Sequence, residues 1–208
     1  MDDTDGCTWF SFISQSCRNN LMNIFYLDKD PKTCAEQHLD KHVVKMLIEY
    51  AQLMSTAHRV LDGVKYIGKS KTGRKVTRYL LENKNEEATV YKACHIHHPS
   101  AVWVRKSAYN YYWLYQMWFY LHEEFKLRYG KEHESYTLLH ELLRNPPKNA
   151  PLNIPFTQPT QAMPDDVKNE DSITAYRDYY IKYKKDFATW KTNIPQWFSE
   201  GISNEMAQ

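Results

Sequence analysis

Two histidines, a lysine and a glutamate follow one another at helical spacing in the N-terminal third of the chain: His38, His42, Lys45 and Glu49. At about 100° per residue, these side chains share one narrow face with Gln52 and Thr56. Two imidazoles, an amine and a carboxylate on one face could move protons and hold an anion. We therefore predict that the first four are catalytic residues of a site.

A single long helix from about Pro31 to Leu61 would position this polar stripe. Asp30 and Pro31 form a favourable N-cap and first position, and Asp62-Gly63 would end the helix. Most of the remaining circumference is apolar, which predicts a buried helix. The polar stripe of a buried helix must face a cavity, a partner or a ligand.

Two other interpretations of the stripe stay open. In the first, Glu49 pairs with Lys45 across one helical turn and the histidines are solvated surface groups. In the second, the His-x-x-x-His spacing of His38 and His42 binds zinc, but Leu39 stands where the zinc-protease pattern has glutamate. We predict no metal and no cofactor.

A second candidate region is the start of another long helix, predicted from about Pro99 to Tyr129. Three histidines precede it, and the backbone N–H groups at a helix start favour an anion such as phosphate. We expect the segment from His95 to Ser100 to share a pocket with the stripe, although solvated loop histidines are the alternative. The candidate nucleic-acid contacts here are His97, His98, Ser100, Arg105 and Lys106.

The segment from Lys65 to Arg78 is strongly basic. It holds six lysines and arginines and no acidic residue, in a chain whose formal net charge is only +2. Two short β-like runs flank a turn-rich centre, which predicts a hairpin. This concentration suits a phosphate backbone, with a solvated loop as the alternative. The candidate contacts are Lys71, Arg74, Lys75 and Arg78.

The remaining pattern predicts an all-α fold: a single domain over residues 22–208, built on two long central helices with the basic turn-rich insertion. A third helix is expected at about Ser135–Leu143 and a last one at about Asp171–Lys191, with an irregular proline-rich stretch between them. Glycine is scarce, and 14% of residues are aromatic, which favours long helices packed through rings. Residues 1–21 are expected to be a disordered extension that is dispensable for folding, with Met22 as the natural start.

Composition also bears on location. Hydrophobic residues make up 42% of the chain and charged residues 25%, a balance typical of soluble globular proteins. The N-terminus lacks the pattern of a signal peptide, the longest apolar stretch is too short to cross a bilayer, and the four cysteines show no Cys-x-x-Cys pair. We expect a cytoplasmic protein.

Two stretches resemble a known family. MNIFYLDKDPKTC leads into AEQHLDKHVVK, and HHPSAVWVRKSAYNYYWLYQMWFYLHEEFKLRYGKEH follows later. They are similar to the pyrimidine-dimer DNA glycosylases of the phage ultraviolet-endonuclease type, over roughly Met22–Leu61 and His95–His133. The sequence also resembles uncharacterised proteins of large marine phages. If a phage encodes this chain, the expected location is the cytoplasm of the host cell.

The glycosylase resemblance implies an all-α fold and action on DNA. In that family an N-terminal α-amine attacks the sugar C1′, expels the base and leaves a Schiff base that undergoes β-elimination, steered by a helix glutamate beside an arginine. Here that pair falls near Val43–Lys45, Glu49 lies one turn further on, and 21 residues precede Met22. Lys45 would be the alternative amine if burial lowered its pKa.

Three functions remain in view. The first is a DNA-processing enzyme of the glycosylase and abasic-site lyase type, acting on damaged or modified bases. The second is a non-catalytic nucleic-acid-binding protein, and the third is an enzyme acting on a small phosphorylated nucleotide. The expected partner is DNA, with no membrane and no obligate protein partner.

Overall fold

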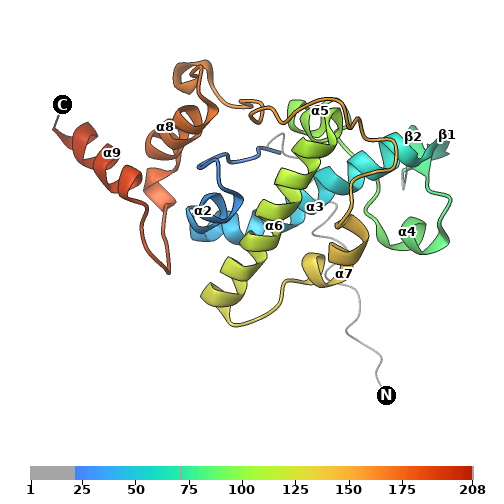
Figure 1. Ribbon diagram of the computed structural model, residues 1–208, viewed down its shortest axis with the longest axis horizontal. Coiled ribbons are helices and arrows are strands. Elements are labelled where there is room, and N and C mark those ends of the chain that lie inside the picture. The colour runs from blue at the N-terminus through green and yellow to red at the C-terminus, as the bar shows by residue number, and fades with distance from the viewer. Residues whose placement is uncertain (1–21, 71, 208) are drawn as a thin grey trace.

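The computed structural model describes residues 22–70 and 72–207, and this part of the chain is mostly helical (Figure 1). The predicted all-α character is confirmed at this level. The α-helices are α2 (Pro31–Glu36), α3 (Asp40–Asp62), α4 (Lys84–Thr89), α5 (Pro99–Lys106), α6 (Ala108–Tyr129), α7 (Glu134–Leu143), α8 (Ser172–Lys184) and α9 (Gln196–Met206). Short 3-10 turns lie at Asp165–Val167 and Lys185–Phe187, and the strands are β1 (Val64–Lys69) and β2 (Lys75–Leu80).

The core forms where α6 crosses α3, with α2, α5 and α7 packed around the crossing (Figure 1). At the crossing Trp118 is fully buried, and its indole N–H donates to the carbonyl of Leu47 at 2.8 Å. The extended segment from Met22 to Leu27 runs through this core, and Ile24 and Leu27 are completely inaccessible. Large aromatic side chains therefore fill the interior, as the composition predicts.

The prediction of a continuous helix from Pro31 to Leu61 is wrong, because residues 37–39 are not helical and separate α2 from α3. Arg128 of α6 stabilises the break. Its guanidinium donates to the carbonyls of Glu36 at 2.8 Å and His38 at 2.7 Å, which have no helical partners there. The break changes the helical phase, so His38 does not continue the stripe of α3.

The second predicted helix, Pro99–Tyr129, is likewise divided in two. Ser107 adopts an extended backbone between α5 and α6, and its hydroxyl accepts from the N–H of Tyr109 as the N-cap of α6. The same hydroxyl donates to the carbonyl of Ile154, and the N–H of Ala108 donates to Pro151. The proline-rich segment thus replaces the helical hydrogen bonds at this break.

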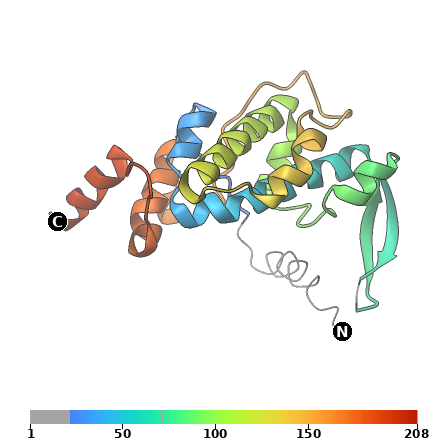
Figure 2. The ribbon, with the colours of Figure 1, turned by 90° about the horizontal axis from the view of Figure 1, so that it is seen from below.

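The predicted hairpin is confirmed. β1 and β2 pair antiparallel from Val64 opposite Leu80 to Lys69 opposite Lys75. Gly73, at φ 79°, occupies the left-handed region that glycine favours, and it lies in the turn. Figure 2 shows the hairpin extending away from the helices, at the end of the molecule opposite α9.

The C-terminal region departs from prediction. The helix expected at Asp171–Lys191 ends at Lys184, and α9 and α4 are additional helices that the sequence pattern did not predict. The third predicted helix is confirmed as α7. In the described residues, no helix combines the length and the apolar character needed to cross a membrane.

Candidate nucleic-acid interface

His38 is a structural residue of the core. Its Nδ1–H donates to the carbonyl of Cys34 at 2.7 Å, and its Nε2 lies 3.0 Å from the hydroxyl of Tyr50. That hydroxyl also accepts from the backbone N–H of Phe25 at 3.2 Å, so its proton points to His38. Burial, together with the positive charge of Arg128, lowers the pKa of His38 to about 4. The imidazole is thus neutral, and both of its ring nitrogens are hydrogen-bonded within the protein.

His42 is also turned inward. Its ring stacks on Phe25 with centroids 4.1 Å apart, and its Nδ1 shares a 2.6 Å hydrogen bond with the hydroxyl of Tyr180 on α8. Burial lowers the pKa of His42 well below 6.5, and the nearby positive charges of Lys184 and Lys45 act in the same direction. His42 therefore joins α3 to α8 and does not line a cavity with His38.

Lys45 and Glu49 pair within α3, as the first alternative interpretation has it. The ammonium of Lys45 lies 3.0 Å from Oε1 of Glu49, and the lysine side chain is half exposed while the glutamate is buried. Schiff-base chemistry requires a desolvated amine, whereas the amine of Lys45 is half exposed and paired with Glu49.

The rest of the stripe is covered by the chain itself. The amide of Gln52 donates to the carbonyl of Lys92 at 2.8 Å, and the Thr56 hydroxyl exchanges hydrogen bonds with the backbone of Cys94. The prediction that the stripe shares a pocket with His95–Ser100 is therefore wrong, because the backbone of the preceding loop forms hydrogen bonds with Gln52 and Thr56.

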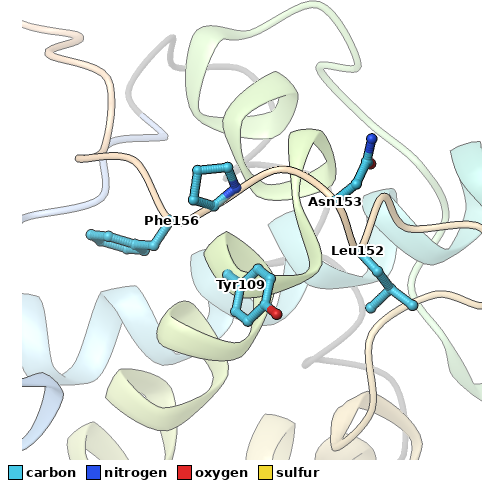
Figure 3. A pocket seen from close by; sticks show the side chains of 5 residues that line it. Tyr109, Leu152, Asn153 and Phe156 are labelled. Carbon is cyan, nitrogen blue, oxygen red and sulfur yellow. The ribbon is translucent and has the colours of Figure 1, made fainter.

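Two hollows in the described part of the chain lie elsewhere. One, of about 320 Å³, lies where the proline-rich segment passes over the first turn of α6 (Figure 3). It is open, and its five lining residues carry no charge: Tyr109, Leu152, Asn153, Pro155 and Phe156. The other lies between α9 and the 3-10 turn after α8. Neither includes a predicted site residue.

A side chain of the protein itself, His98, binds at the start of α5, where an anion site is predicted. His98 is the N-cap of α5, and its Nδ1 accepts from the N–H of Ser100 at 3.2 Å. Burial lowers the pKa of His98, which favours the neutral ring that this cap requires. Ser100 is itself buried, so only His97 of this group is exposed.

The two cations of α5 differ in setting. Arg105 is half-buried and donates to the carbonyl of Ile96 at 2.6 Å, and desolvation lowers its pKa. Lys106 is exposed at the end of the helix. Of the predicted contacts near α5, His97 and Lys106 remain accessible to a large partner.

The hairpin presents the densest set of accessible cations. Lys65, Lys69, Arg74 and Lys75 are exposed, whereas Arg78 is partly covered. The predicted contact Lys71 lies outside the described residues. Because the six basic residues of this segment exceed the net charge of the whole chain, the remainder is net negative. Positive charge is therefore concentrated on one projecting element.

The hairpin is poorly built for its own stability. Lys69 and Lys75 are direct register partners, and like charges in opposite positions destabilise a strand pair. Apolar side chains are also left open to solvent, with Val64 61% and Ile67 65% exposed. A two-stranded ribbon with no packed face is only marginally stable in water. An anionic partner bound on the face of Lys69 and Lys75 would relieve the repulsion.

Arg59, near the end of α3, anchors the base of the hairpin. All three of its side-chain nitrogens donate hydrogen bonds. Nε donates to the carbonyl of Tyr91 at 2.7 Å, and Nη2 donates to the carbonyls of Glu87 and Val90. Nη1 donates to the carbonyl of Tyr79 at 2.9 Å and to the carboxylate of Glu87 at 2.6 Å. The side chain is 2% exposed. This one residue joins α3, β2 and α4.

The sequence pattern did not indicate the roles of Arg59 and its partner Glu87. An arginine among apolar residues near the end of a buried helix was the available signal, since such a cation requires buried partners. Its partners lie 20 to 32 residues further along the chain, and no periodic pattern connects them.

No group of three or more His, Cys, Asp or Glu side chains is placed to hold a metal ion in the part of the chain that the structure describes. Comparison of the sequence and the structure with known protein families, curated proteins and solved structures found no match.

Proposed function

We propose that this protein binds nucleic acid through the basic hairpin formed by β1 and β2. The observation that carries the proposal is the exposed, acid-free set of cations on a projecting ribbon, in a chain that is otherwise net negative. Phosphate backbones bind such surfaces by releasing counterions.

The setting of the hairpin supports a binding role. Gly63 lets the hairpin leave α3 at once, because a Cβ there would collide with the carbonyl oxygen of Arg59. Together with the Arg59 hydrogen bonds, this close approach fixes the base of the ribbon to the helical body. A fixed base lowers the entropy lost when the ribbon binds.

A catalytic role in DNA processing is the less supported proposal. His38 and His42 are occupied by internal hydrogen bonds, which leaves Lys45 with Glu49 as the only predicted catalytic pair near solvent. Borohydride trapping on a duplex with an abasic site tests it directly. A trapped adduct would restore the enzyme proposal, and mass mapping would identify the amine.

Direct binding tests the main proposal. The full chain is titrated into a labelled 20-base-pair DNA duplex at low salt, beside a variant with Lys71, Arg74 and Lys75 changed to glutamate. We expect binding by the parent and a loss of at least about tenfold in the variant, because three phosphate contacts are removed.

A matched variant controls for net charge: Lys131, Lys182 and Lys191, all exposed and outside the hairpin, are changed to glutamate. It should retain most of the affinity. Equal losses in both variants, or no binding by the parent at low salt, would contradict the proposal.

A further inference from the structure

We infer that the hairpin binds double-stranded DNA, with its lysine face in the major groove. This inference rests on the proposed function and adds the form of nucleic acid, the groove and the face of the ribbon. The lysine face is defined by its five exposed residues, Lys65, Ile67, Lys69, Lys75 and Thr77; Tyr79, the register partner of Lys65, lies on the same side and is only partly exposed.

The two faces of the ribbon follow from the strand register. Side chains alternate between faces along a strand, and register partners share a face. Ile67 lies opposite Thr77, and Lys69 lies opposite Lys75, so these four residues share the lysine face with Lys65. All five are exposed. This face is therefore open along its length.

The opposite face is partly closed by its own side chains. Arg78 and Tyr66 are register partners, and both approach Gly68: a Cβ there would lie 3.0 Å from Cγ of Arg78 and 3.3 Å from the ring of Tyr66. Val76 and Arg78 are only partly exposed. Arg78 is therefore partly covered, whereas Tyr66 and the apolar Val64 and Leu80 on the same face remain exposed.

The spacing on the lysine face matches the major groove. Lys65 and Lys69 are four residues apart, or about 14 Å along an extended strand. The major groove of B-DNA is about 12 Å wide and admits a two-stranded ribbon. Cations at the two ends of the face would reach the phosphates on either side. Ile67 and Thr77 would lie between them, over the base edges and thymine methyl groups.

Other forms of nucleic acid fit this face less well. The major groove of A-form RNA is deep and narrow, and side chains cannot enter it. Single strands bind mainly by stacking on exposed rings. The ring on the lysine face is Tyr79, the register partner of Lys65, and it is only partly exposed. Tyr66, the exposed ring of the ribbon, is on the other face.

Competition tests the groove. The full chain is bound to a labelled 20-base-pair DNA duplex and challenged with methyl green, a major-groove ligand, or netropsin, a minor-groove ligand. Duplex RNA and single-stranded DNA of the same sequence are titrated in parallel. We expect methyl green alone to displace the protein, and affinity for duplex DNA at least about fivefold above that for the other two forms. Displacement by netropsin alone, or equal affinity for all three forms, would overturn the inference.

A matched pair of variants tests the face. Lys75→Gln and Arg78→Gln each remove one positive charge from β2, on opposite faces. Lys75→Gln should lower the slope of log affinity against log salt by about 0.9, the value for one lost phosphate contact, and Arg78→Gln by less than half of that. A larger effect of Arg78→Gln would assign binding to the other face. Absence of binding to every probe would remove the proposed function itself, which separates the two failures.

Discussion

His38 shows how a residue suited to catalysis becomes structural through its partners. A neutral imidazole can donate from Nδ1 to Cys34 while accepting at Nε2 from Tyr50. Protonation would add a second N–H facing a hydroxyl whose own proton already points there. The hydrogen bonds and the burial therefore both favour the uncharged ring.

This buried imidazole predicts a pH dependence of stability. The pKa of His38 is lowered to about 4 in the folded chain, as are those of His58 and His133. The unfolded chain binds more protons between pH 6.5 and 4, so the free energy of unfolding falls as pH falls through this window.

His38→Gln should make that fall shallower by up to about 1.4 kcal/mol per pH unit, because one titrating group is removed. Urea unfolding at several pH values between 7.5 and 4.5 measures the difference. His97→Gln, at an exposed position, is the control. An unchanged slope in His38→Gln would show that this residue does not take up the proton.

Arg59 predicts a large stability effect at a single position. Arg59→Met should lower the free energy of unfolding by on the order of 3 kcal/mol, because it leaves Glu87 and several carbonyls without their donor. Arg78→Met on the open hairpin should change it by less than about 0.5 kcal/mol. Denaturant titration compares them, and a similar small loss in both would contradict the anchoring role.

The sequence predicted residue burial better than residue partnership. The apolar girth of α3 correctly indicated a buried helix. The partners of its histidines lie far along the chain, with Tyr180 138 residues from His42. A single-helix projection contains no information about which side chain from another element will meet the stripe.

At the scale of elements, local signals predicted the hairpin and α7, whereas the helix breaks could not be predicted. The basic hairpin has its turn chemistry in its own sequence, including Gly73. The break between α2 and α3 depends on Arg128 from α6, and the break before α6 depends on carbonyls at residues 151 and 154. Both causes are tertiary.

The exposure of the hairpin predicts that it is separable from the fold. Replacing residues 65–78 with a short Gly-Ser turn, while Tyr79 and the Arg59 contacts are kept, should shift the thermal midpoint by only a few degrees, because little apolar surface of this segment is buried. The same change should abolish nucleic-acid binding. Thermal unfolding followed by circular dichroism and a DNA titration check the two halves, and loss of the folded state would show that the ribbon supports the core.

At the scale of the whole molecule, the basic hairpin lies outside the helical body that contains the core. The helical body, built around α3 and α6, holds the buried histidines and the aromatic core, while the basic ribbon extends from one end (Figure 2). The sequence predicted both the basic concentration and the helical character. It did not predict that the polar stripe would be satisfied internally, which moves the candidate interface from α3 to the hairpin.

The salt dependence of DNA binding tests the central claim most directly. Affinity of the full chain for a 20-base-pair duplex is measured from 25 to 200 mM salt, beside a variant in which Lys65, Lys69 and Lys75 are changed to glutamine. We predict that log affinity falls linearly with log salt and that the variant lowers the slope by about 2 to 3, near 0.9 for each lost phosphate contact. A parent that binds with no salt dependence, or a variant with the slope of the parent, would contradict binding through the basic hairpin.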